Sequence, residues 1–233
     1  MAGGAGNNST MSPMDKSSLR DAPPAYIVVE GPIGVGKTSL ARLLAEAFGS
    51  ELVLEHPGEN PFLERFYSAR RRYALPTQLF FLFQRARQLE SLKQSDMFAP
   101  SRVADFLLQK DALFARVNLD DDEFRLYRQV YEHLAPEIPV PDLVIYLQAP
   151  VEVLRERIER RGVDYERLMD REYLQQLVDA YTRFFYRYTD TPLLIINAAE
   201  INFVDVEGDF RTLIERIRTT RSGRHYFNPL STA

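Results

Sequence analysis

"GPIGVGKTSL", from Gly31 to Leu40, matches the pattern G-x-x-x-x-G-K-[ST] without a mismatch. The β-branched run before it, AYIVVE, predicts a strand buried on both faces, and the Ala- and Leu-rich residues after it predict a helix. A glycine-rich loop between a strand and a helix is the context in which this pattern binds phosphate. The stretch therefore predicts an α/β fold with a nucleotide-binding site.

The residue types in this loop suit the chemistry of phosphate. Gly34 allows the backbone N–H groups to converge on phosphate oxygens, and the following helix adds its positive N-terminal end. We expect Lys37 to contact the β- and γ-phosphates and the Thr38 hydroxyl to ligate Mg²⁺. The candidate nucleotide-binding residues are Gly31, Gly34, Val35, Gly36, Lys37, Thr38 and Ser39.

Strand-like runs alternate with helical patterns along the rest of the chain. The predicted strands are residues 25–31, 51–55, 101–108, 142–149 and 192–198. The predicted helices are residues 38–48, 76–92, 120–134, 151–161, 171–188 and 203–219. This alternation predicts a five-stranded parallel sheet with helices on both faces. We expect one domain over residues 25–220, a disordered leader over residues 1–24 and a polar tail over residues 221–233.

Composition and charge exclude or disfavour several classes of protein. The 233 residues contain no cysteine, which excludes disulfides, thiolate metal sites and cysteine nucleophiles. The net charge of -4 disfavours a nucleic-acid partner. No apolar run approaches the ~18 residues of a membrane span, so we expect no membrane partner. The leader lacks the features of a signal or transit peptide, and we therefore expect a cytoplasmic protein.

A glutamate stands at the end of the second predicted strand. In LVLEHPGENPFLERFY, residues 52–67, the apolar run ends at Glu55. Parallel strands bring their carboxyl ends to one edge of the sheet, where ligands bind, so this carboxylate is expected to face the phosphate loop. There it could take the proton of an attacking alcohol. A surface glutamate that caps a loop is the open alternative.

Three segments together resemble a known family. EGPIGVGKTSL, LEHPGENPFLERFY and RRRYALPTQLFFLFQRARQL occur in this order and look like the deoxynucleoside kinases, above all their bacterial deoxyadenosine and deoxyguanosine kinase branch. The resemblance covers residues 25–219. It implies a P-loop kinase fold with a helical lid, and a homodimer that transfers the γ-phosphate of ATP to the 5′-hydroxyl of a deoxynucleoside.

The resemblance also implies roles for individual residues. Glu55 matches the family's general base, and Gln78 and Arg85 match the residues that contact the nucleobase. An amide offers both a donor and an acceptor, and Arg85 follows Gln78 by two turns on one helical face, which fits a shared site. Taken singly, either residue could instead belong to an ordinary amphipathic helix.

Other residues match the family's sugar site and lid. Tyr67 and Glu166 match the residues that hold the sugar 3′-hydroxyl, and Phe114 matches the aromatic residue packed on the base. The stretch LRERIERRGVDYE looks like the lid, where Arg157 and Arg161 are one turn apart and would stabilise charge on the transferring phosphate. A solvated helix face with internal ion pairs is the alternative for these two arginines.

The chain departs from the family pattern at three positions. Val163 stands where a lid arginine is common. The family's acid-Arg-Ser motif appears as Ala104-Asp105-Phe106, so its arginine is absent, while Asp105 is still expected to serve the Mg²⁺ shell. Lys110 falls where many relatives have an acid near the base, which leaves the preferred purine open.

Two other functions remain open from the sequence. A nucleoside-monophosphate kinase, such as a thymidylate kinase, shares the loop and lid, and the arginines at 70–72 could clamp an acceptor phosphate. A non-catalytic structural subunit, such as one accessory protein of respiratory complex I, also resembles this fold. The pair Gln78 and Glu55 favours a nucleoside acceptor, and the intact Lys37 favours an enzyme.

Overall fold

The computed structural model describes residues 23–93, 101–134, 139–201, 203 and 206–228, so nearly all of the predicted leader lies outside the described residues. The strands are β1 (Tyr26–Glu30), β2 (Glu51–Val53), β3 (Arg102–Ala104), β4 (Leu143–Gln148), β5 (Leu193–Asn197) and β6 (Arg224–Phe227). The α-helices are α2 (Lys37–Phe48), α3 (Leu63–Ser68), α4 (Arg70–Lys93), α5 (Lys110–Asn118), α6 (Asp121–Leu134), α7 (Val151–Arg161), α8 (Arg171–Arg187) and α9 (Glu207–Thr219). Two 3₁₀ helices are η1 (Pro57–Glu59) and η2 (Asp164–Leu168).

The strands form one parallel sheet in the order β2-β3-β1-β4-β5-β6. From β1 the chain first builds the β3 and β2 side and then crosses to β4 on the other side. A crevice opens at the carboxyl ends of the strands where the strand order changes direction. The loop after β1 and the residues after β2 and β3 all meet at this edge.

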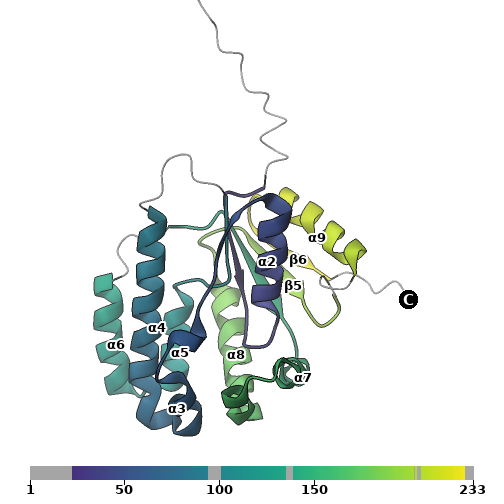
Figure 1. Cartoon of the computed structure of the whole chain (residues 1–233). Helices are drawn as coiled ribbons and strands as arrows, with labels where there is room; N and C mark the ends of the chain where they lie inside the picture. The colour runs from purple at the N-terminus through teal and green to yellow at the C-terminus, as the bar shows by residue number, and fades with distance from the viewer. Residues whose placement is uncertain (1–22, 94–100, 135–138, 202, 204–205, 229–233) are drawn as a thin grey trace, which may run out of the picture.

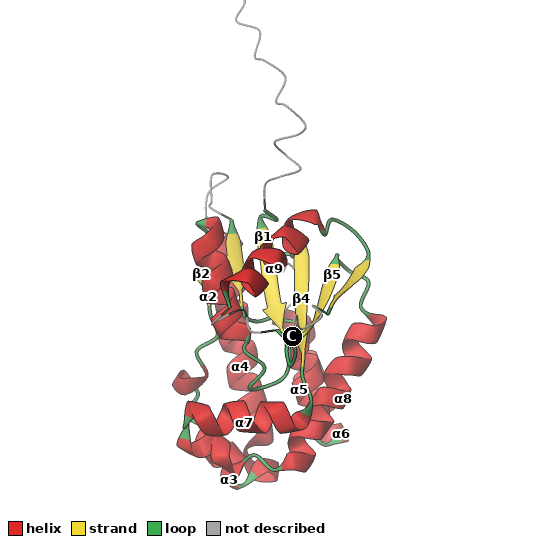
Figure 2. Cartoon of the chain, turned by 90° about the vertical axis from the view of Figure 1, so that its right-hand side faces the viewer, coloured by secondary structure: helices red, strands yellow, loops and turns green. Residues whose placement is uncertain are grey.

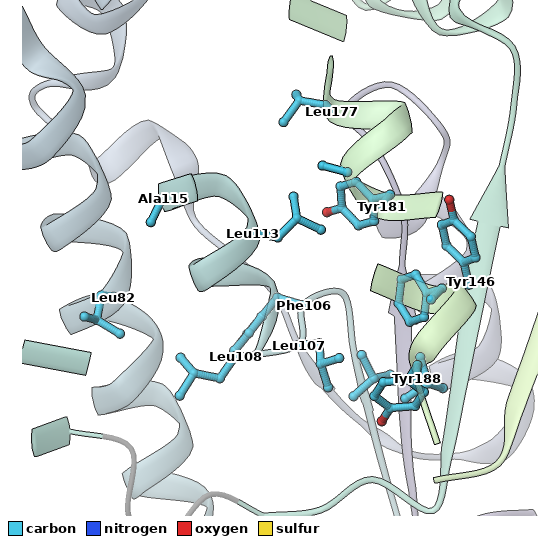
Figure 3. Packing of buried hydrophobic residues seen from close by; sticks show 14 of the residues in the cluster. Leu82, Phe106, Leu107, Leu108, Leu113, Ala115, Tyr146, Leu177, Tyr181 and Tyr188 are labelled. Atoms are coloured by element: carbon cyan, nitrogen blue, oxygen red, sulfur yellow. The ribbon is translucent and has the colours of Figure 1, made fainter. Parts of the chain in front are cut away.

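Helices cover both faces of the sheet (Figure 1). Alternate residues of β1 serve the two faces, because Ile27 and Val29 pack with α2 and α9, and Val28 packs on the side of α4, α5 and α8. Figure 3 shows part of this second core, with Leu82 from α4, Leu113 from α5 and Tyr181 from α8. Helix α7 crosses below the carboxyl ends of the strands (Figure 2).

The predicted number of strands was too low by one. Residues 224–227, which we expected within a surface tail, form β6 and pair in parallel with β5. This strand is short and its residues are exposed or half-buried, so it has no alternation of apolar and polar residues from which a strand could be predicted. It forms because the backbone groups at the edge of β5 need hydrogen-bonding partners, and the residue types of this segment do not indicate that need.

Several predicted boundaries also shift. Pro76 suits the first turn of a helix, yet α4 begins six residues earlier at Arg70 and contains this proline. The third strand ends at Ala104, and residues 105–108 continue as a buried segment without strand pairing. The described part of the chain has no helix that is both long and apolar enough to cross a membrane.

Candidate active site

The phosphate loop joins β1 to α2 in the conformation that the motif requires. Gly34 and Gly36 have φ of 83° and 105°, a backbone region that residues with a Cβ adopt only with strain. The Lys37 ammonium lies across the loop and donates to the carbonyls of Gly31 (2.8 Å) and Pro32 (3.2 Å). Burial, with repulsion from Lys110, lowers the pKa of Lys37 to about 8. A bound polyphosphate would draw this cation toward its oxygens.

Asp105 links the loop helix to the end of β2. Its Oδ2 accepts a hydrogen bond from the Thr38 hydroxyl at 2.6 Å, and its Oδ1 accepts one from the backbone N–H of Glu55 at 2.7 Å. A hydroxyl and a carboxylate side by side, next to a phosphate loop, suit the oxygen preference of Mg²⁺. No group of three or more His, Cys, Asp or Glu side chains within the described ranges is placed to hold a metal alone. The donor set therefore fits an ion that also takes phosphate oxygens.

The Glu55 carboxylate lies in the crevice between two cations. Arg85 forms an ion pair with its Oε1, and the Lys110 ammonium lies 3.5 Å from its Oε2. Burial raises the pKa of Glu55, but Arg85, Lys110 and Lys37 outweigh burial and bring this pKa to about 2. The carboxylate is therefore ionised throughout the physiological pH range.

Helix α4 presents polar groups to the same crevice. Gln78 and Arg85, only 3% and 4% exposed, lie on one face with Phe81 between them. Arg85 is shared with the buried Asp111, and its guanidinium lies 5.0 Å from the centre of the Phe81 ring. Burial raises the pKa of Asp111 to about 6, although Arg85 opposes this shift. The hydroxyl of Thr77, also buried here, has no hydrogen-bonding partner in the described chain.

Aromatic residues and a second ion pair close the crevice opposite the loop. Tyr67 stacks on Tyr165 with ring centres 5.9 Å apart, and burial raises the pKa of Tyr67 well above its ordinary value. Arg161 pairs with Glu166 on the short helix η2. Phe114 projects from α5, and its ring packs edge-on against the ring of Tyr181. These groups would surround a flat, partly polar molecule.

Most of the predicted site residues line one pocket. Those that line it are Gly34, Lys37, Thr38, Glu55, Tyr67, Gln78, Arg85, Asp105, Phe114, Arg161 and Glu166. Arg157 does not line it. Its guanidinium donates to the carbonyls of Val35 (3.0 Å) and Ala198 (2.7 Å), so it braces α7 against the loop and the end of β5. Its predicted role at the transferring phosphate stays a prediction.

Glu30, the last residue of β1, was not predicted from the sequence to belong to the site. This fully buried carboxylate accepts hydrogen bonds from the N–H groups of Gly31 (2.9 Å) and Leu107 (2.7 Å) and from the Tyr181 hydroxyl (3.0 Å). It also lies 3.4 Å from the Lys110 ammonium. The sequence does contain a signal for Glu30, because this acid ends an apolar run, which is the same feature that identified Glu55.

Comparisons with known proteins point to one family. The sequence model of the family described as deoxynucleoside kinase matches residues 27–221. A deoxyguanosine kinase of Bacillus subtilis (strain 168) is 30% identical over 200 residues, which make up 83% of this chain and 96% of that relative. A deoxyadenosine kinase of Dictyostelium discoideum is 30% identical over 233 residues, covering 97% of this chain and 89% of the relative.

Solved structures are similar over the same part of the chain. The structure of deoxyadenosine kinase from M. mycoides with bound dATP has a TM-score of 0.72 and 26% identity, covering 82% of this chain and 98% of that chain. A second structure of that kinase, with the products dCMP and a flexible dCDP bound, has a TM-score of 0.73 at 25% identity. The family model covers most of the chain, and the chain therefore belongs to the deoxynucleoside kinase family.

Proposed function

We propose that this deoxynucleoside kinase transfers the γ-phosphoryl group of ATP to the 5′-hydroxyl of a purine deoxynucleoside. The observation that carries the proposal is the position of Glu55. Its backbone N–H is tied through Asp105 to Thr38 at the start of the loop helix. An acceptor hydroxyl at Glu55 would therefore stand opposite the phosphate loop, which is the geometry that phosphoryl transfer needs.

The reaction exchanges one P–O bond for another. The bond from the γ-phosphorus to the oxygen that bridges it to the β-phosphate breaks, and a bond to the 5′-oxygen forms. The hydroxyl proton passes to Glu55 and from there to solvent. A carboxyl group with a pKa of about 2 is a weak base. It suits a loose transition state, in which the hydroxyl becomes acidic only late and must first be held in line by a hydrogen bond.

Cations around the loop stabilise the charge of the transferring group. Lys37 lies at the loop, and Arg161 reaches the pocket from the lid helix α7. We assign Thr38 and Asp105 to a Mg²⁺ ion, which would neutralise charge on the β- and γ-phosphates when bound. Preorganised charges of this kind act mainly on the transition state.

The acceptor is a nucleoside rather than a nucleoside monophosphate. Of the arginines considered for an acceptor-phosphate clamp, Arg70 pairs with Asp170 at 3.2 Å and lies 4.0 Å from the centre of the Tyr173 ring. Residues 70–72 contribute nothing to the lining of the pocket. The amide of Gln78 and the guanidinium of Arg85 can instead read the edge of a base. A purine is supported by the relatives named for deoxyguanosine and deoxyadenosine.

We also propose that the enzyme is a cytoplasmic homodimer that acts on free nucleosides and not on nucleic acid or membranes. The dimer is supported by the resemblance to the family alone. The location is supported by the absence of cysteine and by the leader composition. A purine acceptor and a cytoplasmic location suit the recovery of deoxynucleosides from degraded DNA.

The proposed function is tested by supplying Mg-ATP with single deoxynucleosides and, separately, with deoxynucleoside monophosphates. We expect 5′-monophosphates to form from deoxyadenosine or deoxyguanosine. In Glu55→Gln the kcat should fall about 10²–10⁴-fold, because the carboxylate that receives the proton is lost, while calorimetry shows little change in ATP binding.

Glu64→Gln, an exposed change on α3, is the matched control and should keep the parental rate. Products that arise only from monophosphates would replace this proposal with a monophosphate kinase. Absence of turnover with every acceptor would point to a non-catalytic subunit.

A further inference from the structure

A buried lysine that lines the pocket lies between two carboxylates. Lys110 is the first residue of α5 and is 2% exposed. Its ammonium is 3.4 Å from Oε1 of Glu30 and 3.5 Å from Oε2 of Glu55, and the side chain lines the pocket. A buried ammonium is costly unless it is paired, and the two carboxylates provide that pairing.

The two carboxylates are not equally fixed. Glu30 is held by three hydrogen bonds, from Gly31 N–H, Leu107 N–H and the Tyr181 hydroxyl. The Gly31 bond joins it to the first residue of the phosphate loop. Glu55 is partly exposed and faces the space for the acceptor. Lys110 therefore connects a rigid anchor at the donor site to the group that meets the acceptor.

Different cations hold the two oxygens of Glu55. Arg85 pairs with Oε1, and Lys110 approaches Oε2. Arg85 also pairs with Asp111, which directly follows Lys110 on α5. Each oxygen of the Glu55 carboxylate thus has its own cationic partner, and both cations contribute to the orientation of the carboxylate plane.

The local sequence explains why a lysine serves here. Position 106, directly after Asp105, carries a buried phenylalanine that packs into the core and provides no charge. Lys110 lies four residues further on, at the first turn of α5, and its chain reaches back to the crevice. The cation beside Oε2 of Glu55 is therefore supplied from α5.

We propose that Lys110 is a positioning residue for phosphoryl transfer, holding the Glu55 carboxylate in line with the acceptor hydroxyl by anchoring it to Glu30 at the base of the phosphate loop. The inference rests on the proposed function and deepens it. It predicts that Lys110 contributes to turnover through Glu55, and hardly to the affinity for either substrate.

A double-mutant cycle tests this prediction. Lys110→Met keeps the length and apolar stem of the side chain and removes the charge. We expect its kcat to fall about 10- to 100-fold, the loss that a displacement of ~1 Å can cause, with the nucleoside KM changed by less than about threefold. In a Glu55→Gln background the same change should cost less than about threefold, because the group through which Lys110 acts is already lost. Lys110→Arg, which retains the charge, should recover part of the rate.

Three results would overturn the inference. The first is a Lys110→Met enzyme with the parental kcat. The second is an equal loss in the parental and the Glu55→Gln backgrounds, which would show a structural role at Glu30. The third is a loss that appears only in KM. Should Lys110→Met fail to fold, Lys110→Gln, which can still hydrogen-bond to Glu30, carries the same cycle.

A matched control and the parental enzyme complete the design. Arg116→Met removes an exposed cation from the same helix and should leave kcat unchanged. An inactive parental enzyme would overturn the proposed function and the inference with it. An active parental enzyme with an unaffected Lys110→Met variant would overturn the inference alone.

Discussion

Gln78, which we propose reads the edge of the base, allows binding of the acceptor to be tested separately from binding of the donor. It is buried on α4 and lines the pocket. The phosphate loop belongs to a different part of the chain, between β1 and α2. Gln78→Leu keeps the size of the side chain but leaves polar atoms of the base unpaired. That loss costs about 1–3 kcal/mol, so the nucleoside Kd should rise roughly 5- to 150-fold. Calorimetry with the nucleoside and with ATP gives both affinities.

The ATP affinity should stay at the parental value in this variant. Gln176→Leu, an exposed change on α8, controls for the general effect of replacing an amide with an apolar group. Equal losses for ATP and nucleoside would mean that α4 itself was disturbed, and would remove Gln78 from base recognition.

Individual residues of the site were predictable where their spacing along the chain carries the chemistry. Lys37 and Thr38 follow from one contiguous motif, and Glu55 follows from its place at the end of a strand. Glu30 occupies an equivalent place, but its partners come from residue 107 and from α8, far away in the chain. Only the fold brings those groups to one point.

At the scale of elements, the phosphate loop and the lid helix are in contact through a glycine. A Cβ added to Gly34 would lie 2.8 Å from Cγ1 of Ile158 and 2.9 Å from the carbonyl oxygen of Leu154, both on α7. Arg157 of the same helix donates to the carbonyl of Val35. Loop and lid therefore hold each other in place, and a change in one should be felt in the other.

Gly34→Ala should impair catalysis by displacing α7. A residue with a Cβ at φ of +83° costs roughly 1–2 kcal/mol, and the contact with Leu154 adds to this strain. We expect kcat to fall by about 10²-fold, as for a ~1 Å misplacement of the lid, with a measurable fall in ATP affinity. Steady-state kinetics and calorimetry provide these values.

Gly208→Ala is the comparison variant, since a Cβ there meets nothing within 4 Å. It should retain the parental rate and ATP affinity. Normal kinetics in Gly34→Ala would show that the loop and α7 are not coupled in the working enzyme.

Elements were predictable where a pattern is long enough to be read. Helix α8, with buried residues at helical spacing over Arg171–Arg187, agrees closely with the predicted range. Helices α3 and α5 are short and were not predicted. Their own buried residues do not form a regular apolar stripe at helical spacing. β6 was missed because pairing with β5, and not its side chains, makes it a strand.

Across the whole molecule, the last strand also closes the end of a helix. The Arg224 Nη2 lies 2.9, 2.8 and 3.2 Å from the carbonyl oxygens of Phe185, Tyr186 and Tyr188 at the end of α8. The final carbonyls of a helix have no partner inside the helix, and a cation there also interacts favourably with the negative end of the helix dipole. One side chain of β6 thus fastens α8 to the edge of the sheet.

Arg224→Met should lower the stability of the fold without altering catalysis. Loss of charged hydrogen bonds to these carbonyls is expected to reduce the free energy of unfolding by about 1–3 kcal/mol, measured by urea denaturation. The nucleoside KM and kcat should be unchanged, because β6 lies at the sheet edge away from the pocket residues. Arg183→Met, an exposed change on α8, should leave stability within about 0.5 kcal/mol of the parent. Equal stability losses in the two variants would argue against the capping role.

The place of β6 has a consequence for synthesis on the ribosome. Translation delivers the chain from its N-terminus, so β1 to β5 and all the residues of the pocket emerge before residues 224–227. Until those residues emerge, the outer edge of β5 exposes unpaired backbone groups, and the end of α8 lacks Arg224. The nascent chain therefore carries all the residues that line the pocket on an unfinished sheet. The emergence of residues 224–227 is the event that closes that edge.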